Sequence, residues 1–430
     1  MRRQIHHQGR HLVNREESSA YRVYVMFMLV LVYTFNFIDR QIISILAVPI
    51  KADLALSDTE LGLMGGLAFA LFYTALGIPI AMWADRGNRV GIMSIALAVW
   101  SAMTAACGLA QNFWQLFLAR LGVGVGEAGG VAPAYSLISD YFPSAQRARA
   151  ISVYAFGIPI GSALGIVFGG LIASKIDWRY AFFVVGLAGV LLAPFFRLTV
   201  REPIRGRFDS DRQVSPASLG TVVARLRHKP SFWLLSFGAA FSSMAGYGLF
   251  FWLPSFFVRS YGLSLLNASL YYGAIFLVGG LAGIWLGGMF ADKFGRVSRA
   301  AYAVIPGVAF LATIPLYALA ILSDNLFVAF FVFLLPTALG LAWLGPVISA
   351  IQHVVNANIR ATASAVFLFI VNLIGLGLGT VAIGALSDAL TERLGNDALR
   401  YSILAGTSFY LLAAACLFLA ARRLHEDWEN

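Results

Sequence analysis

Four ionisable side chains lie inside otherwise apolar stretches of this sequence. Asp39 and Arg40 are adjacent in the stretch that opens at Tyr24, and Arg120 and Glu127 share a later one. A charge near the centre of a bilayer costs roughly 2.5 to 3.5 kcal/mol on insertion scales, so it survives mainly with a partner or in a watery cavity. We therefore expect Asp39 and Glu127 to exchange protons, with Arg40 and Arg120 as movable counter-charges.

Helical geometry predicts how these groups meet. Arg120 and Glu127 are separated by close to two full turns, so they project to nearly one face, about 10 Å apart along the axis. Counting inward from the expected helix ends places Asp39, Arg40 and Glu127 level near the middle of the membrane, with Arg120 closer to the outside. The alternative is a static salt-bridge cluster that only fixes helix packing.

The elements that hold these residues are predicted to be membrane-spanning helices. Hydrophobic residues make up 59% of the 430 residues, charged residues 12%, and the mean hydropathy is +0.78, which excludes an ordinary soluble domain. A span needs about 20 mostly apolar residues. The apolar runs predict an all-α polytopic membrane protein with twelve transmembrane helices, at about 22–50, 59–83, 91–110, 113–140, 150–174, 180–198, 231–258, 266–290, 299–322, 326–354, 362–386 and 400–421.

Basic residues set the expected orientation. Of the 31 Lys and Arg residues, 23 fall on the side that holds both termini, six on the other side and two within helices. The positive-inside rule therefore places both termini in the cytoplasm. The predicted organisation is an N-terminal tail at 1–21, a six-helix bundle at 22–200, a basic linker at 201–230, a second six-helix bundle at 231–421 and a C-terminal tail at 422–430.

Other function classes lack their motifs. Cys107 and Cys416 both lie in apolar runs, so neither a disulfide framework nor a metal cluster is indicated. The sequence has no phosphate-cradling Gly-Lys-Ser/Thr loop, no His-Glu-x-x-His pattern and no serine nucleophile elbow. We therefore predict no cofactor, no ATP drive and no enzymatic activity. The net charge of +10 is explained by the positive-inside rule and does not indicate nucleic-acid binding.

An internal repeat supports two related halves. The sequence ADRGNR at 84–89 returns as ADKFGR at 291–296, and RARAISVY at 147–154 is echoed by RATASAVF at 360–367. The charged loop residues are expected to latch the cytoplasmic side when the carrier opens outward; the alternative is that they merely tie loops together. The candidate gate residues are Asp85, Arg86, Arg89, Asp292, Lys293 and Arg296.

The stretch 288–296 (GMFADKFGR) resembles the G-x-x-x-D-[RK]-x-G-[RK] loop of the major facilitator superfamily. The first-half copy departs from it, because Ala81 and Asn88 stand where glycines are usual. Within that superfamily, 36–41 (NFIDRQ) and 122–128 (GVGVGEA) resemble the spinster-type transporters. The resemblance implies a secondary transporter. It also implies an amphiphilic anion such as a lysolipid or sphingosine phosphate as substrate.

The second half offers only uncharged candidate residues for the cavity. It has no acid in the middle of any span, so an asymmetric site is expected, with charges in the first half and an apolar or aromatic wall in the second. Each aromatic residue has packing or the interfacial belt as its alternative role. The candidate cavity residues are Tyr33 and Asn36 with Met244, Tyr247, Trp252, Trp343, Phe367 and Asn372.

Together these patterns predict a monomeric, proton-coupled secondary transporter of the plasma membrane that rocks two bundles around a midplane site. Its expected partners are an amphiphilic substrate, protons and membrane lipids, and export is the preferred direction. Three alternatives remain open. They are a carrier of another small organic anion or drug, a sensor that binds ligand without transporting it, and an intramembrane enzyme on lipids.

Overall fold

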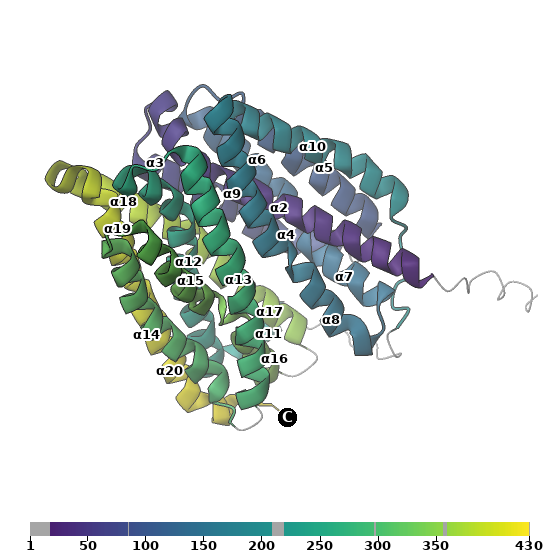
Figure 1. Ribbon diagram of the computed structural model, residues 1–430. Helices are drawn as coiled ribbons and strands as arrows, with labels where there is room; N and C mark the ends of the chain where they lie inside the picture. The colour runs from purple at the N-terminus through teal and green to yellow at the C-terminus, as the bar shows by residue number, and fades with distance from the viewer. Residues whose placement is uncertain (1–17, 85, 209–218, 296–297, 356–358, 430) are drawn as a thin grey trace, which may run out of the picture.

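The computed structural model describes residues 18–84, 86–208, 219–295, 298–355 and 359–429, and every regular element in these ranges is helical. The N-terminal half (Figure 1) consists of α2 (Ser19–Leu54), α3 (Asp58–Gly62), a π-helical turn (Leu63–Leu67), α4 (Ala68–Ala84), α5 (Arg89–Cys107), α6 (Phe113–Glu127), α7 (Val131–Tyr141), α8 (Ser144–Ala155), α9 (Gly157–Lys175) and α10 (Trp178–Thr199).

The second half begins with a short linker helix. Its elements are α11 (Leu219–Leu226), α12 (Pro230–Tyr261), α13 (Leu265–Gly295), α14 (Ala301–Leu322), α15 (Leu326–Leu341), α16 (Leu344–Val354), α17 (Arg360–Ile370), a second π-helical turn (Val371–Leu376), α18 (Gly377–Leu394), a 3-10 turn (Gly395–Asp397), α19 (Ala398–Gly406) and α20 (Phe409–Asp427). Because α2 begins at Ser19 and α20 ends at Asp427, both terminal helices extend beyond the spans expected from the sequence.

The described residues contain ten helical stretches that are long and apolar enough to cross a membrane. The last stretch, Thr362–Asp427, is long enough for two spans and corresponds to predicted helices 11 and 12. Predicted helix 4 is not among the ten, because it is divided into α6 and α7. With these two differences explained, the helices agree with twelve spans.

Two helical bundles stand side by side in Figure 1. We call the end with the start of α2, the start of α8 and α11 the linker end, and the end with α3 and the start of α6 the distal end. Buried apolar residues of both bundles form one continuous core that includes Ile42 and Leu61 of the first bundle and Phe256 of the second. A separate core, which includes Leu29 and Leu137, fills the linker end of the first bundle. The bundles therefore share apolar packing mainly towards the distal end.

Glycines let α9 approach α2 closely. A Cβ atom added at Gly165 would lie 2.8 Å from the carbonyl oxygen of Ile38, and one added at Gly157 would lie 3.0 Å from the Tyr33 side chain. Small residues at such spacing allow close contact between membrane helices. These glycines thus let α9 pack against α2, the helix that carries Asp39 and Arg40.

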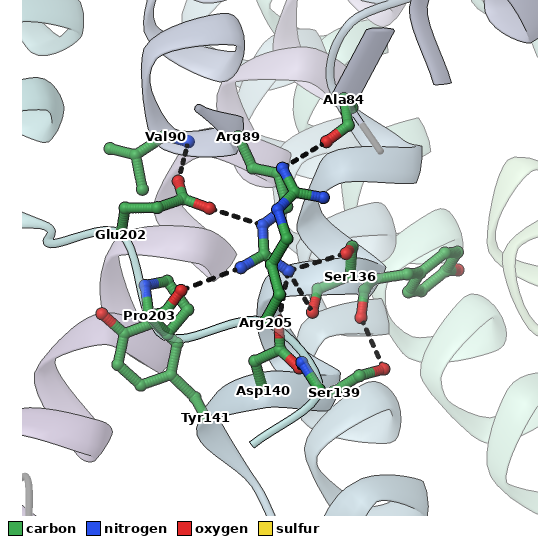
Figure 2. Close-up of polar contacts among 12 residues, drawn as sticks. Ala84, Arg89, Val90, Ser136, Ser139, Asp140, Tyr141, Glu202, Pro203 and Arg205 are labelled. Atoms are coloured by element: carbon green, nitrogen blue, oxygen red, sulfur yellow. Dashed lines mark hydrogen bonds and ion pairs between the residues drawn. The ribbon is translucent and has the colours of Figure 1, made fainter. Parts of the chain in front are cut away.

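At the linker end of the first bundle, Arg89 joins α5, α7 and the start of the linker (Figure 2). Its Nε donates to Glu202 Oε1 at 2.6 Å, and its Nη1 pairs with Asp140. Arg205 of the linker donates to the carbonyl oxygen of Ala84 at 2.8 Å. Arg89 and Asp140 are buried. The described start of the linker is therefore bound to the first bundle.

At the linker end of the second bundle, the last helix, α20, binds the start of the first helix, α12. Asp427 Oδ2 accepts hydrogen bonds from the backbone nitrogen and the hydroxyl of Ser231, at 2.9 and 2.6 Å. Lys229 Nζ donates to the carbonyl oxygen of Asp427 at 2.8 Å. An acid near a helix N-terminus is favourable. The last residues of α20 thus complete the start of α12.

Candidate functional site

The four intramembrane charges lie where two helices depart from regular geometry. Glu127 is the last residue of α6, and a short turn at 128–130 separates it from α7. Arg120 lies about two turns earlier in the same helix, beside the π-helical turn Leu63–Leu67. Broken helices within a membrane are tolerated where they are buried in protein or line a cavity, and they often mark binding sites.

Arg40 and Glu127 form a close ion pair, with Nε 2.6 Å from Oε2. Three rings surround the Arg40 guanidinium: its Cζ is 5.1 Å from the ring centre of Phe37 and 4.7 Å from those of Phe69 and Tyr73. Cation–π contacts strengthen when the cation is desolvated. Glu127 is fully buried, so this pair holds α2 against α6 inside the protein.

Asp39 and Arg120 are arranged differently. Asp39 is fully buried, and neither of its carboxyl oxygens has a hydrogen-bond partner. Arg120 instead donates to the backbone oxygen of Asp39 at 3.2 Å and, at the long distance of 3.5 Å, to that of Met64. The Asp39 carboxyl group faces Trp100 and Thr104 of α5, whose side-chain N–H and O–H groups also lack partners. The cluster therefore contains one closed pair and one acid without a partner.

Tyrosines gather next to Arg40. The rings of Tyr33 and Tyr154 stack at 4.2 Å, and Tyr135 meets Tyr154 edge to face at 5.7 Å. Tyr73 covers Arg40, and Tyr247 of α12 packs against the same apolar core of the first bundle. We call these five residues the tyrosine cluster. It joins side chains from α2, α4, α7, α8 and α12, and it offers hydroxyl groups beside a cation.

The structure separates the predicted cavity residues into two sets. Trp252 is fully buried and donates through Nε1 to the Thr380 backbone oxygen at 2.9 Å, and Trp343 and Phe367 lie in the shared apolar core. These three aromatic residues take the packing role. Asn36 is buried beside the charges with an amide group that has no partner. The other cavity candidates are half-buried: Tyr33, Met244, Tyr247 and Asn372.

The predicted gate is only partly described. Asp85 and Arg296 lie outside the described residues, and the side chain of Asp292 is not described either. Arg86 and Lys293 are exposed. The described partners of Arg89 belong to the first bundle and to the linker. Arg89 therefore does not join the two bundles in this structure, because its guanidinium is already used by Asp140 and Glu202.

A network that the sequence analysis missed joins the bundles at the distal end. Asp58 is the first residue of α3, and its carboxylate accepts a hydrogen bond from Lys51 Nζ at 2.5 Å. It also accepts hydrogen bonds from both terminal nitrogens of Arg259 in α12, at 2.7 and 2.8 Å. Ser387 of α18 donates to the same carboxylate at 2.7 Å. Asp388 accepts the first two backbone N–H groups of α3, at 2.9 and 2.7 Å. We call this the distal latch.

The sequence does contain one local signal for the distal latch, at the start of α3. Ser57 and Glu60 form a capping box at the start of α3, a pattern that the sequence shows directly. It marks the helix N-terminus at which an acid from another helix is favourable. Nothing in the sequence pairs Asp388 or Arg259 with that helix, because each contact depends on how the bundles dock.

Comparison with known proteins agrees with this architecture. A family model described as Major Facilitator Superfamily matches residues 29–380. The chain belongs to the major facilitator superfamily. As members of this superfamily do, it folds as a membrane transporter rather than as an enzyme.

The relatives of this major facilitator protein include spinster proteins. A protein named "MFS-type efflux pump" from Mycolicibacterium smegmatis is 35% identical over 407 residues, which cover 93% of this chain and 92% of that protein. Protein spinster homolog 1 from Xenopus tropicalis is 30% identical over 397 residues, 87% of this chain and 74% of that one. The spinster resemblance seen in the sequence is thereby confirmed.

A solved structure shows the same fold. It is described as a bacterial homolog of the human lysosomal transporter spinster in an inward-facing and unoccupied conformation. It matches with a TM-score of 0.87 at 36% identity and covers 96% of this chain and 100% of its own. The predicted fold class is therefore confirmed.

Proposed function

We propose that this protein is a proton-coupled secondary transporter of amphiphilic organic anions that works by alternating access. The observation that carries the proposal is the unequal state of two buried acids. Glu127 is closed onto Arg40, whereas Asp39, the residue before Arg40, has no partner for its carboxyl group. A change of partner between two acids changes their proton occupancy, which is the minimum that coupling requires.

Helix movement supplies the change of partner. Arg40 and Asp39 lie on α2, and Glu127 lies at the end of α6, next to a break in the helix. A shift of α2 along α6 moves Arg40 away from Glu127 and leaves that acid to take up a proton. Arg120, whose described hydrogen bonds all go to backbone oxygens and which also lies over the Phe69 ring, is then available as a counter-charge.

The closed distal end supports a state open towards the cytoplasm. We place the linker end in the cytoplasm on the basis of the excess of basic residues there, and we place the protein in the plasma membrane as a monomer. The distal latch and the shared apolar core then close the outward side. A spinster relative with the same fold is described as inward-facing, which supports this assignment.

The tyrosine cluster suits an amphiphilic anion. Hydroxyl groups and the Arg40 guanidinium donate hydrogen bonds to an anionic headgroup, and such charge-assisted bonds are strong. The ring faces provide an apolar surface for a chain. The resemblance to spinster-type transporters implies a lipid-like substrate, and the name of the efflux-pump relative supports export.

The test is flux in proteoliposomes. A panel of radiolabelled lysolipids, sphingoid phosphates and small organic anions is measured with and without a pH gradient, for the parent and Glu127→Gln. Glu392→Gln, which changes an exposed acid at the distal end, is the matched control. We expect Glu127→Gln to lose gradient-driven flux and to keep substrate exchange. Unchanged gradient-driven flux in Glu127→Gln removes it as the coupling acid.

A second candidate substrate class is a small drug-like molecule. The efflux-pump relative favours it, since it is 35% identical over nearly the whole chain. Addition of neutral and cationic drugs to the same panel distinguishes the two classes. A protein that binds a compound but moves none of the panel would instead be a ligand sensor.

A further inference from the structure

An apolar groove lies on the side of the first bundle at the linker end, apart from the central charges. Val23, Phe27 and Val30 of α2 line one wall, and Ala150 and Val153 of α8 line the other. Its volume is about 650 Å³. Figure 1 shows the first half of α2 on the near side of this bundle, with α8 below it. Val23 and Phe27 expose 65% and 59% of their surface, so the groove is open.

The groove lies at membrane depth. Its residues on α2 fall within the candidate span Ser19–Leu54, and Val153 falls within the span Arg149–Lys175. From Val23 to Val30 the helix rises by about 10 Å. The walls therefore run from the surface of the bilayer into the first part of its hydrocarbon, where an acyl chain is the natural occupant.

A free cation lies in the same groove. Arg149 and Gln146 line it, and both are exposed. Within the described part of the chain Arg149 has no ion pair or hydrogen bond, whereas the nearby Arg147 donates to the Ser139 backbone oxygen at 2.9 Å. No acid lines the groove. Its charge is thus complementary to an anionic headgroup held at the membrane surface.

The tyrosine cluster follows the groove residues along both helices. The stacked rings of Tyr33 and Tyr154 follow directly after Val30 and Val153 on the two helices. Gly157, at the start of α9, contacts Tyr33 and brings the helices together at this level. Along α2 this ring pair therefore lies between the groove residues and Arg40.

We propose that the groove between α2 and α8 binds an anionic glycerophospholipid of the surrounding bilayer, with its phosphate at Arg149 and Gln146 and one acyl chain along Phe27 and Val153. This site is independent of the proposed transport function, because none of its residues belongs to the central charge cluster. Occupancy ties α8 to α2 at the linker end of the bundle.

The experiment measures lipid retention by the full chain in detergent. Delipidated parent, groove variants and Glu127→Gln are titrated with dioleoyl phosphatidylglycerol, dioleoyl phosphatidylcholine or lysophosphatidylglycerol, and bound lipid is counted by native mass spectrometry. Arg149→Gln removes the cation, Val153→Trp fills the apolar part, and Arg197→Gln removes an exposed arginine in the last turn of α10 that does not line the groove.

We expect Arg149→Gln to weaken retention of phosphatidylglycerol about fivefold and to remove its preference over phosphatidylcholine. Val153→Trp should weaken retention of both lipids, and Arg197→Gln should behave as the parent. Equal losses in Arg149→Gln and Arg197→Gln would overturn the site. So would retention of lysophosphatidylglycerol in place of the two-chain lipid, or an equal loss in Glu127→Gln, which would place the lipid at the central site.

Discussion

Arg40 is the residue on which the central charges depend. One edge of its guanidinium group donates to Glu127, and the rings of Phe37, Phe69 and Tyr73 surround the group. Removal of one partner from a buried pair typically costs 3 to 5 kcal/mol, because the other charge is left uncompensated. The stability of the bundle and its proposed coupling thus depend on the same side chain.

We predict that Arg40→Ala destabilises the protein by about 3 to 5 kcal/mol and that the further change Glu127→Gln restores much of this loss. The double variant no longer buries an unpaired charge. Thermal unfolding of purified protein in detergent measures the effect. If the double variant is no more stable than Arg40→Ala, the Arg40–Glu127 pair does not explain the loss.

Asp39→Asn should behave in the opposite way. Its carboxyl oxygens make no hydrogen bond of normal geometry, and an amide oxygen can still face the Trp100 and Thr104 donors, so we expect stability within about 1 kcal/mol of the parent. Gradient-driven flux in proteoliposomes should nevertheless be lost. A variant that unfolds as readily as Arg40→Ala would show that Asp39 has a structural partner instead.

The sequence points to these charges more directly than to the tyrosine cluster, of which it names only Tyr33 and Tyr247. Asp39, Arg40, Arg120 and Glu127 are conspicuous because ionisable residues are costly within an apolar run. Tyrosine carries no such signal, since it is common in membrane interfaces and cores. Tyr73, Tyr135 and Tyr154 come together only because α4, α7 and α8 meet around α2.

At the scale of the helix, small residues decide how closely α9 packs on α2. We predict that Gly165→Ala destabilises the protein by about 1 to 3 kcal/mol, since its new Cβ atom would lie 2.8 Å from the Ile38 backbone oxygen. Gly77→Ala in α4 is the control, because nothing lies within 4 Å of its added Cβ atom. Thermal unfolding compares the two. Equal effects would mean that helix propensity, and not contact with α2, sets the cost.

Helix continuity was harder to predict than helix position. The sequence indicates one span at 113–140, whereas the chain breaks after Glu127. Hydropathy does not register the break, because Ala128, Gly129 and Gly130 are themselves compatible with an apolar run. The break is a property of the backbone, and it positions the acid at a helix end.

At the scale of the whole molecule, the distal latch holds the two bundles together on one side. We predict that Asp58→Asn shifts the protein towards a state open at the distal end, because it weakens contacts to Lys51 and Arg259. A change of about 1.4 kcal/mol alters the ratio of two states tenfold. Spin labels at Lys175 and Arg393, in a background without Cys107 and Cys416, should report a larger population of long distances.

Asp53→Asn provides the matched control for the latch. Asp53 pairs with Arg179, and both residues belong to the first bundle. Its loss removes a charge pair at the same end without affecting a described contact between bundles. If Asp53→Asn lengthens the distances as much as Asp58→Asn does, general loss of charge explains the shift and the latch does not.

The twelve-helix fold followed from hydropathy and from the repeated loop, but the closed end did not. Local patterns fix each span and its direction. Which end of the two bundles closes depends on a small difference between alternative packings of the same helices. Contacts such as Arg259 with Asp58 join residues 201 positions apart, and no local pattern reports them.

The linker ends of the two bundles are completed by contacts from different parts of the chain, and this affects the order in which the bundles can fold during synthesis. The first needs Glu202 to complete the contacts of Arg89, so its linker end can be assembled before the ribosome reaches the second half. The second needs Asp427, the last residue of α20, to satisfy the start of α12. We therefore expect the first bundle to fold during synthesis while the second remains incomplete until α20 has been made. The incomplete second bundle is then the part of the nascent chain that quality-control proteases can cleave.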